Sequence, residues 1–477
     1  MKGSSPDPPV RAVGSTMTLS PHIFREYDIR GIVGRDLTPA LAGEVGRAYG
    51  TILVSRWGGK GREVERPRVV VGWDNRPTSP ALMEALSEGL AGSGVDVLEL
   101  GVVPTPVTWW AETTLGVDGA LQVTGSHNPP EWNGIKMTLL GRSLYGDGVQ
   151  ELRRRIETGD LVPGRGTRTP TPILDRYVED LVPRFHLPRP VKVVVDCGNG
   201  TGSVVAERFL TAVGAEVIPL YCESDGTFPN HHPDPTVDEN LEELIRQVRT
   251  NGAEVGIAFD GDADRLGVVD GDGQVIRGDI LLLIFGLDLL ARRGPGQLLL
   301  YDVKCSQVLP EVYEAAGGKT IMWKTGHSLM KEKMRETGAP LAGELSGHIC
   351  FADDYLGIDD ALYAAARLVE VVANRTQSLS QQVDSFPRFV STPELRLEVP
   401  EEEKVGIVER AVAHFGPKHP VIDVDGARIL FPHGWGLLRA SNTQPVLVAR
   451  FEAPTEEQLT EIRTEVEDWL QTQGVHA

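Results

Sequence analysis

The sequence predicts an α/β protein of three related βαβ-type domains with mixed sheets, followed by a smaller C-terminal α+β domain. Three observations lead to this fold class. Short, unbroken apolar runs recur along the chain. Each run is followed by a helix-length segment that a glycine ends, and then by a second apolar run. From about residue 390, polar and apolar residues alternate instead.

The first strand of each predicted unit is an apolar run that ends in an aspartate. These runs cover residues 69–74, 193–196 and 298–302. Such runs are typical of buried parallel strands. The glycines that end the following helices are Gly94, Gly214 and Gly318. The second runs cover 95–100, 215–220 and 320–323, which completes a βαβ unit in each case.

A third apolar run in each unit leads into a polar loop. The loops cover residues 124–130, 260–265 and 343–348. In open parallel sheets, ligands bind beyond the carboxyl ends of the strands. We therefore expect the chemistry of the protein in these loops.

The C-terminal region predicts an antiparallel sheet with helices. Its expected strands cover 394–399, 428–431 and 445–451, before an acidic, helix-like end. Turn-rich stretches at 163–172, 270–273 and 385–393 indicate the domain boundaries. The expected divisions are a loose tail, 1–20, and four domains, 21–168, 169–273, 274–387 and 388–477.

Composition excludes several classes of partner. The chain has 477 residues, with 47 Lys+Arg against 67 Asp+Glu and a net charge of −20, which argues against nucleic acid and anionic membranes. The longest apolar run, 280–287, is far shorter than the ~18 residues of a membrane span. The four cysteines show no CxxC spacing, which indicates neither a disulfide framework nor a zinc site and favours a reducing cytoplasm.

Asp260, Asp262 and Asp264 place three carboxylates at alternate positions directly after an apolar run. This spacing can direct several oxygens at one hard cation. An EF-hand is excluded because its sixth position would be Arg265 and its twelfth Gly271. Three carboxylates fill only part of an octahedral shell, so we expect a Mg²⁺ site that leaves room for a phosphate oxygen, rather than an acidic turn.

Ser126 lies in the first polar loop, where a serine is accessible for nucleophilic chemistry. The G-x-S-x-G pattern of acyl-transfer hydrolases is absent. Alone, this serine would more often be a turn residue, but a cation loop in the next domain strengthens the nucleophile interpretation. The segment 439–443 adds a guanidinium, hydroxyls and an amide, which suit phosphate oxygens or a polar hairpin equally well.

Two further motifs have structural explanations. The glycine-rich segment 197–202 fails the G-x-G-x-x-G pattern because residue 203 is serine, so close packing is the expected role of its glycines. His231 and His232 stand between prolines without an identifiable third ligand, which favours a solvated or capping turn over a metal site.

Taken together, these motifs resemble those of the α-D-phosphohexomutase family, most closely its bifunctional bacterial phosphomannomutase/phosphoglucomutase branch. The resemblance runs from about Phe24 along nearly the whole chain. The segments that carry it are 24–31, 124–130, 260–265, 323–327, 343–348 and 439–443.

The resemblance implies four domains around a central cleft and a phosphorylated serine that exchanges phosphate with a sugar. It implies that Ser126 is the phosphoserine and completes a Mg²⁺ site with Asp260, Asp262 and Asp264. It places the sugar hydroxyls at Glu344, Ser346 and His348, and the non-reacting phosphate at Arg439, Ser441, Asn442 and Thr443. The other cleft residues it implies are Tyr27, Arg30, His127, Lys136, Arg265, Lys304 and His327. Lys136 and His348 are the acid and base candidates, in an order that sequence does not assign.

The implied activity is that of an isomerase, the reversible interconversion of hexose 1-phosphates and 6-phosphates of mannose and glucose through a 1,6-bisphosphate. Glucose 1,6-bisphosphate is the expected activator, and a monomer or weak homodimer the expected state. A phosphoserine near charge −2 beside three aspartates would be strongly repulsive, so Mg²⁺ and Arg265 are expected to offset this charge.

Three alternatives stay open. A phosphoglucosamine mutase is disfavoured because Leu345 and Asn442 stand where those enzymes usually have Gln and Gly. A magnesium-dependent sugar-phosphate phosphatase would use the same groups with water as the acceptor. A non-catalytic sugar-phosphate sensor would not need Ser126 together with three aspartates.

Overall fold

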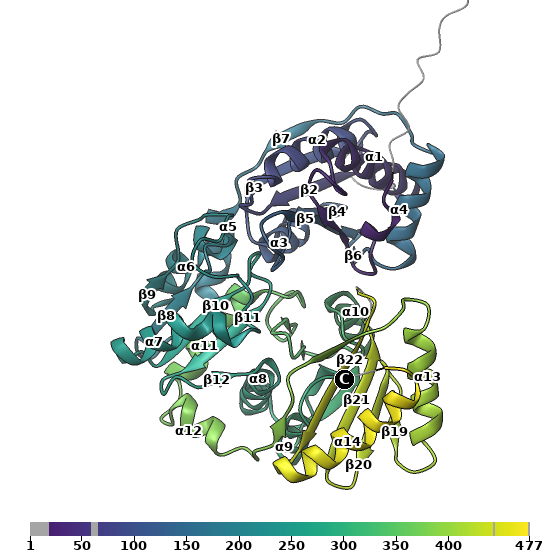
Figure 1. The fold of residues 1–477 in the computed structure, drawn as a ribbon. Helices are drawn as coiled ribbons and strands as arrows, with labels where there is room; N and C mark the ends of the chain where they lie inside the picture. Colours follow the sequence, from purple (N-terminus) through teal and green to yellow (C-terminus); the bar gives the residue numbers. More distant parts are fainter. Residues whose placement is uncertain (1–18, 59–64, 442–443, 476–477) are drawn as a thin grey trace, which may run out of the picture.

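The computed structural model describes residues 19–58, 65–441 and 444–475. Most of the expected N-terminal tail, and the predicted site residues Asn442 and Thr443, lie outside the described residues. The chain forms four sheets, each with its own helices, arranged as four successive domains (Figure 1). The predicted fold class, three α/β domains and a C-terminal α+β domain, is confirmed.

Domain 1 is a seven-stranded sheet between two layers of helices. Its strands, in order across the sheet, are β1 (Ile29–Ile32), β5 (Trp132–Leu139), β4 (Gly119–Val123), β2 (Arg68–Trp73), β3 (Asp96–Val102) and β7 (Arg168–Pro170), with β6 (Arg142–Ser143) paired to β5. Its helices are α1 (Pro39–Arg56), α2 (Ser79–Ala91), α3 (Thr105–Leu115) and α4 (Asp147–Thr158). Val69 and Val71 of β2 pack in the cluster of α1 and α2, whereas Val70 faces that of α3, because side chains alternate along a strand.

Domains 2 and 3 repeat this arrangement with fewer strands. The second sheet has the order β12 (Val275–Ile276), β11 (Leu266–Asp270), β10 (Val255–Phe259), β8 (Lys192–Asp196) and β9 (Glu216–Leu220). The third has the order β14 (Lys319–Trp323), β13 (Leu298–Asp302), β15 (Leu341–Gly343) and β16 (Ile349–Phe351). Their helices are α5 (Leu174–Leu181), α6 (Ala206–Val213), α7 (Glu242–Asn251), α8 (Gly278–Arg293), α9 (Val308–Ala315), α10 (His327–Thr337), α11 (Ala361–Ala373) and α12 (Leu379–Asp384). Short 3₁₀ helices are η1 (Pro21–Ile23), η2 (Val182–Arg184), η3 (Thr201–Val204) and η4 (Asp238–Leu241).

The three α/β domains share one strand order. The parallel strands β4-β2-β3, β10-β8-β9 and β15-β13-β14 each run third, first, second in chain order. In each domain the third parallel strand then pairs with an antiparallel strand, β5, β11 or β16. Each predicted polar loop is the connection between these two strands, so the three loops occupy equivalent positions at the carboxyl edges of the sheets.

Domain 4 has the antiparallel sheet that the sequence predicts. Its strands are β17 (Val390–Ser391), β22 (Val446–Ala453), β21 (Gly434–Ala440), β20 (Ala427–Phe431) and β19 (Val421–Ile422), with β18 (Leu395–Glu398) also beside β22. Helices α13 (Lys404–Phe415) and α14 (Glu456–Thr472) cover one face of the sheet (Figure 1). On the other face, Trp435 and Leu437 pack against Val303 of domain 3.

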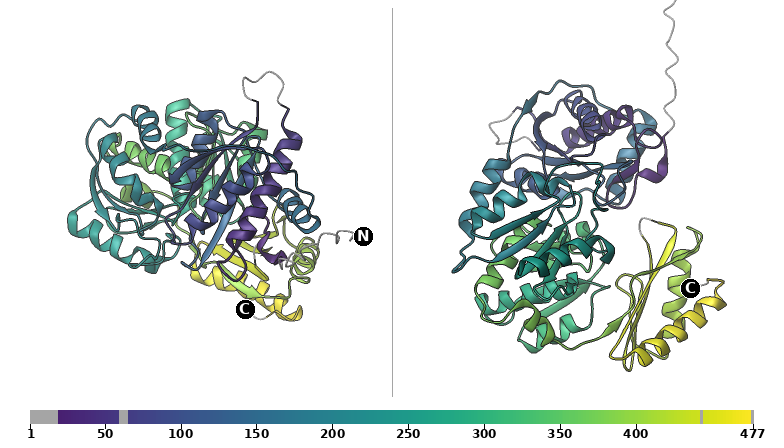
Figure 2. Two further views of the ribbon diagram at one scale, coloured as in Figure 1. Left: turned by 90° about the horizontal axis from the view of Figure 1, so that it is seen from above. Right: turned by 60° about the vertical axis from the view of Figure 1, so that its left-hand side comes forward.

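The cores show how strongly the domains are joined. One buried apolar cluster is continuous through domains 1, 2 and 3, and it includes Val107 of α3, Phe209 of α6 and Leu282 of α8. Domain 4 has a main cluster of its own and meets domain 3 through only a small separate one. In Figure 2 the yellow C-terminal domain accordingly lies to one side of the other three. Among the described residues, no helix is both long and apolar enough to cross a membrane.

Candidate active site

Ser126 lies between β4 and β5 in a conformation that non-glycine residues rarely adopt, with φ of 50°. The residue is only 2% exposed. Its Oγ donates to Oδ2 of Asp260 at 3.1 Å and lies 3.1 Å from Nδ1 of His127. Its backbone N–H donates to Oγ1 of Thr124 at 2.8 Å, which helps to hold the turn. The first and second polar loops therefore meet at the serine hydroxyl.

Arg76 is hydrogen-bonded to the backbone of the serine loop. Sequence analysis did not identify this residue. Nη2 donates to the carbonyls of Ser126 at 2.7 Å and Asn128 at 2.6 Å, and Nη1 donates to the carbonyl of Pro129 at 2.5 Å. Nε donates to Asp74 at 3.0 Å, and the arginine is 1% exposed. The signal was present in the sequence, since Asp74 and Arg76 directly follow β2 at the carboxyl edge of the sheet.

The three predicted metal ligands are completely buried side by side. One carboxylate oxygen from each of Asp260, Asp262 and Asp264 lies within 4.8 Å of the others. Burial and the two neighbouring aspartates raise the pKa of Asp260 well above its usual value. Gly261 sits so close to the serine loop that a Cβ there would lie 2.3 Å from the carbonyl oxygen of Ser126.

This donor set fits a hard divalent cation. Oδ1 of Asp262 and Oδ1 of Asp264 are buried and have no hydrogen-bond partner among the described residues. Carboxylate oxygens are the ligands that Mg²⁺ prefers, and buried carboxylates without a partner are costly. Lys136 offsets part of this charge, because its Nζ donates to Asp262 at 2.8 Å and to Asp264 at 2.5 Å.

Of two further predicted cations, Arg30 is bonded to the Ser126 loop and Arg265 directly follows the three aspartates. Arg30 donates to the side-chain oxygen of Asn128 at 2.7 Å and pairs with Asp28 at 2.5 Å. Arg265 directs Nε to Nε2 of His348 at 3.0 Å. Arg30 therefore lies at the Ser126 loop and Arg265 next to the aspartates. A phosphoryl group would carry negative charge in this region.

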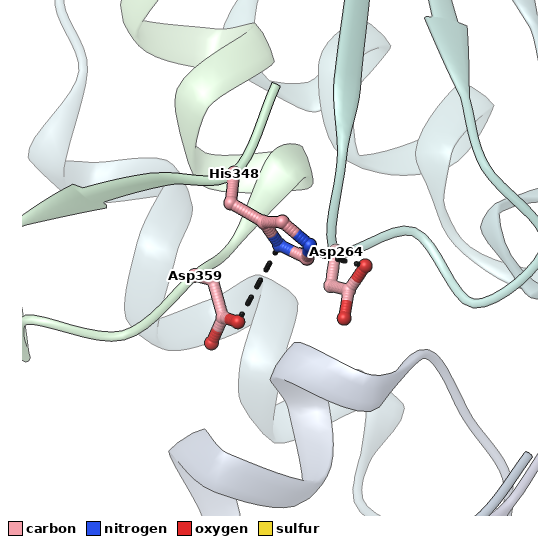
Figure 3. A group of neighbouring side chains, drawn as sticks. All are labelled: Asp264, His348 and Asp359. Carbon is pink, nitrogen blue, oxygen red and sulfur yellow. Dashed lines mark ion pairs between the residues drawn. The ribbon is translucent and has the colours of Figure 1, made fainter. Parts of the chain in front are cut away.

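His348 connects the metal loop to domain 3 (Figure 3). Its Nδ1 lies 3.5 Å from Asp359 and 3.7 Å from Asp264. Because Nε2 accepts from Arg265, the neutral ring carries its proton on Nδ1, toward these carboxylates. Burial and Arg265 hold the pKa of His348 well below its usual value.

Asp359 is a second residue that sequence analysis missed. It is fully buried, lies 3.0 Å from Nδ1 of His327 and accepts from Lys331 at 2.8 Å. The rings of His327 and His348 stack with centroids 5.4 Å apart. The following residue, Asp360, caps the N-terminus of α11 by accepting from the N–H of Tyr363, so the helix fixes where Asp359 lies. No sequence pattern marks Asp359, because its partners come from other segments.

Glu344 and Ser346 lie together in the third polar loop. Glu344 accepts from the N–H of Gly326 at 2.9 Å and from Oγ of Ser346 at 3.2 Å. Burial, with Asp302 nearby, raises the pKa of Glu344 to about 7. Tyr27 joins domain 1 to this region by donating to the carbonyl of Thr325 at 3.0 Å.

The predicted phosphate residues lie where domains 3 and 4 meet. Lys304 donates to Glu394 at 2.6 Å. Arg439 lies 3.1 Å from Asp425 through both Nε and Nη2, and Asp425 also accepts from the N–H of Thr325 at 3.0 Å. Ser441, two positions after this arginine in the chain, is buried. The structure thus joins Arg439 to the 323–327 segment through Asp425, which sequence analysis did not identify.

The glycine-rich segment 197–202 and the pair His231 and His232 both have structural roles in the fold. A Cβ at Gly200 would lie 2.7 Å from the carbonyl oxygen of Gly261, so this glycine allows close packing on the metal loop. His231 is more than a solvated turn residue, because it pairs with Asp196 at 3.1 Å and packs edge-on against Tyr221.

Comparison with known proteins agrees with this arrangement. The chain matches family models described as phosphoglucomutase/phosphomannomutase alpha/beta/alpha domains I, II and III over residues 21–162, 175–273 and 277–389, and the C-terminal domain over 394–468. It is 46% identical over 449 residues to the phosphomannomutase/phosphoglucomutase of Pseudomonas aeruginosa, covering 94% of this chain and 95% of the relative. The phosphoglucomutase of Neisseria gonorrhoeae is 43% identical over 446 residues, covering 92% and 95%. A crystal structure of a phosphoglucomutase/phosphomannomutase family protein from Burkholderia thailandensis superposes with a TM-score of 0.88 at 44% identity, covering 95% of this chain and 98% of that one.

Proposed function

Since the chain belongs to the phosphoglucomutase/phosphomannomutase family, we propose that it is an isomerase that interconverts the 1-phosphates and 6-phosphates of mannose and glucose. The observation that carries the proposal is the contact between Ser126 Oγ and Asp260 inside a buried group of three aspartates. A serine hydroxyl against a cation site is what transfer of a phosphoryl group requires.

In this reaction Ser126 carries the phosphoryl group and donates it to a hydroxyl of the bound sugar phosphate. The bond from phosphorus to Ser126 Oγ breaks as the bond to the sugar oxygen forms, and the sugar hydroxyl passes its proton to a base, for which Lys136 and His348 are the predicted candidates. The resulting 1,6-bisphosphate turns over and returns its other phosphoryl group to Ser126. Arg30 and Arg265 border the position where this charge is transferred.

Asp260, Asp262 and Asp264 would hold Mg²⁺ together with an oxygen of the phosphorylated Ser126. Bound there, the ion supplies Lewis-acid stabilisation of the transferring group and offsets the carboxylate charge. Lys136 contributes a positive charge at the same carboxylates. The assignment of Lys136 and His348 as proton-transfer residues stays a prediction.

Glu344 and Ser346 are proposed to hold the sugar hydroxyls, with Tyr27 and His327 beside them. Arg439, Ser441 and Lys304 are proposed to bind the phosphate that does not react, with Asn442 and Thr443 as predicted partners. Phosphate oxygens would then replace the carboxylates of Asp425 and Glu394 as partners of Arg439 and Lys304. Because this site belongs largely to domain 4, we propose that domain 4 opens when the bisphosphate turns over.

The remaining proposals concern the activator, the cellular compartment, the oligomeric state and the partners of the protein. Glucose 1,6-bisphosphate is the proposed activator, because it can transfer one phosphoryl group to Ser126 and is itself converted to a hexose monophosphate. The protein is proposed to act in the cytoplasm as a monomer or weak homodimer, on small hexose phosphates and without nucleic-acid or membrane partners.

The test is to supply the purified protein with Mg²⁺, a catalytic amount of glucose 1,6-bisphosphate, and either mannose 1-phosphate or glucose 1-phosphate. We expect both sugars to be converted to their 6-phosphates, and Ser126→Ala to abolish the conversion. Ser55→Ala, on an exposed residue at the end of α1, is the matched control. Release of inorganic phosphate alone would instead indicate a phosphatase, and reaction with only glucosamine 1-phosphate an amino-sugar mutase.

A further inference from the structure

Two cysteines that are 25 positions apart in the chain lie against each other in domain 2. Cys197 directly follows β8, and Cys222 lies two residues beyond β9, the parallel neighbour of β8. Their sulfur atoms are 3.2 Å apart, and both cysteines are free thiols. The sequence separation conceals this pair, because only the parallel pairing of the two strands brings their ends together.

The two thiols are close enough to be joined by a small shift of the two loops that carry them. A disulfide bond has a sulfur–sulfur distance of about 2.05 Å, so an approach of about 1 Å is sufficient. Cys197 is completely buried, whereas Cys222 is only partly buried. An oxidant would therefore reach Cys222 first and find Cys197 in place as its resolving partner.

We propose that Cys197 and Cys222 form a reversible disulfide on exposure to a hydroperoxide, and that this bond lowers the activity of the neighbouring phosphoryl-transfer site.

The reaction balances with hydrogen peroxide as oxidant. The thiolate of Cys222 attacks one peroxide oxygen, the oxygen–oxygen bond breaks, and a sulfenic acid forms with release of water after proton transfer. The sulfur of Cys197 then attacks the sulfenic sulfur of Cys222 and forms the disulfide. The hydroxyl of the sulfenic acid leaves with the thiol proton of Cys197 as a second water. In total, two thiols and one peroxide give one disulfide and two waters, and an added dithiol reverses the change.

The electrostatic surroundings favour this order of events. The hydrogen bond shared with Cys197 lowers the pKa of Cys222, while the same contact and burial raise the pKa of Cys197. The thiolate is the nucleophilic form of cysteine, so the more accessible thiol is also the more reactive one.

The cysteine loops are bonded directly to the site. Four residues after Cys197, Thr201 donates its backbone N–H at 2.9 Å to the carbonyl of Gly261, between two of the aspartates. Asn75, next to Arg76, donates to the carbonyl of Asn199 at 2.7 Å and to Oγ of Ser224 at 2.9 Å. A bond between Cys197 and Cys222 therefore pulls on loops that contact both the metal loop and the support of Ser126.

This effect on activity rests on the proposed function, whereas formation of the disulfide does not. The direct test is to treat the full-length protein with hydrogen peroxide, block free thiols, and digest it with trypsin without reduction. Cleavage after Lys192, Arg208 and Arg246 places the two cysteines in separate peptides, 193–208 and 209–246. We expect these peptides to be linked in treated protein and separate after dithiothreitol. Cys305 and Cys350, which are buried, are the internal controls and should stay reduced.

The second measurement is mutase activity before oxidation, after it, and after reduction. A displacement of ~1 Å near a site can cost up to ~10²-fold in rate, and we expect a loss of about tenfold that dithiothreitol reverses. Cys222→Ser and Cys197→Ala should each keep wild-type activity in reducing buffer and resist the reversible loss.

Two results would overturn the proposal. If peroxide leaves the peptides unlinked, or converts Cys222 to higher oxides without joining Cys197, no disulfide site exists. If the peptides are linked but activity is unchanged, the disulfide does not act on the site. If the untreated enzyme lacks mutase activity, the proposed function fails, while the peptide result still decides whether the disulfide forms.

Discussion

Around Ser126 the loop carbonyls bond to the buried Arg76, whereas at the other end of the site Arg439 and Lys304 pair with the carboxylates of Asp425 and Glu394. The serine end lies within three domains that share one continuous core. The cationic end lies where domain 3 meets domain 4, and domain 4 joins domain 3 only through a small separate apolar cluster. A reacting group needs a fixed position, while a site that releases and rebinds phosphate needs partners that can be exchanged.

This difference predicts that changes at the serine end act mainly on kcat and changes at the domain 4 end mainly on KM. The following experiments test that division, beginning with the largest expected effect.

Removal of the divalent cation should abolish turnover. Treatment with a chelator is expected to reduce kcat by more than about 10³-fold, since the buried carboxylates would repel the phosphoryl group without it. Mg²⁺ should restore the rate, and Asp262→Asn should prevent the restoration. Asp272→Asn, on an exposed turn, is the matched control. Full activity in chelator would refute the proposed metal site.

Arg76→Met should destabilise the protein and reduce kcat together. The substitution leaves Asp74 and the loop carbonyls buried without their hydrogen-bond donor. Loss of one partner of a buried ion pair lowers the free energy of unfolding by about 3–5 kcal/mol. We expect a lower melting temperature, a kcat lower by about 10²-fold and little change in KM.

Arg388→Met is the control for Arg76→Met, because Arg388 pairs with Asp384 between two exposed side chains and such pairs contribute little. If Arg76→Met raised KM and left kcat unchanged, Arg76 would not be what positions Ser126.

Arg439→Lys should raise KM for both hexose 1-phosphates about tenfold and change kcat less. Lysine keeps the charge but cannot present two parallel N–H donors to a phosphate. Steady-state kinetics provide the measurement, and Arg463→Lys, on the outer helix α14, is the control. An equal loss in kcat with constant KM would mean that Arg439 acts on the transition state.

The smallest effect concerns the pH dependence of stability at Glu344. Its pKa is raised from 4.5 to about 7 by burial and by Asp302, so the folded protein binds a proton that the unfolded chain has lost. Stability from this group is therefore present below pH 4.5 and falls as the pH rises toward 7, by at most about 3 kcal/mol.

Glu344→Gln removes this titration and keeps an oxygen that can accept from the N–H of Gly326. The melting temperature of the variant relative to wild type should therefore be higher at pH 7.5 than at pH 5. A constant difference across this range would show that Glu344 titrates normally.

The sequence alone predicted most of the fold, because strands buried on both faces leave continuous apolar runs. The runs at 193–196 and 298–302 correspond to β8 and β13, and the alternating segment 394–399 to β18. The polar loops were also predictable, because each follows an apolar run at a strand end. The resemblance to the phosphohexomutase family then predicted roles for residues such as Glu344 and Arg439. The local sequence pattern does not define those roles.

Only the tertiary structure placed Arg76 against the serine loop, Asp359 beside both His327 and His348, and Cys197 against Cys222. These contacts join residues that are distant in the chain, and their distances depend on how strands pair and how domains pack. A sequence records local periodicity and the chemical nature of each side chain. It does not record which buried charge faces which carbonyl, because that depends on the packing of the whole chain.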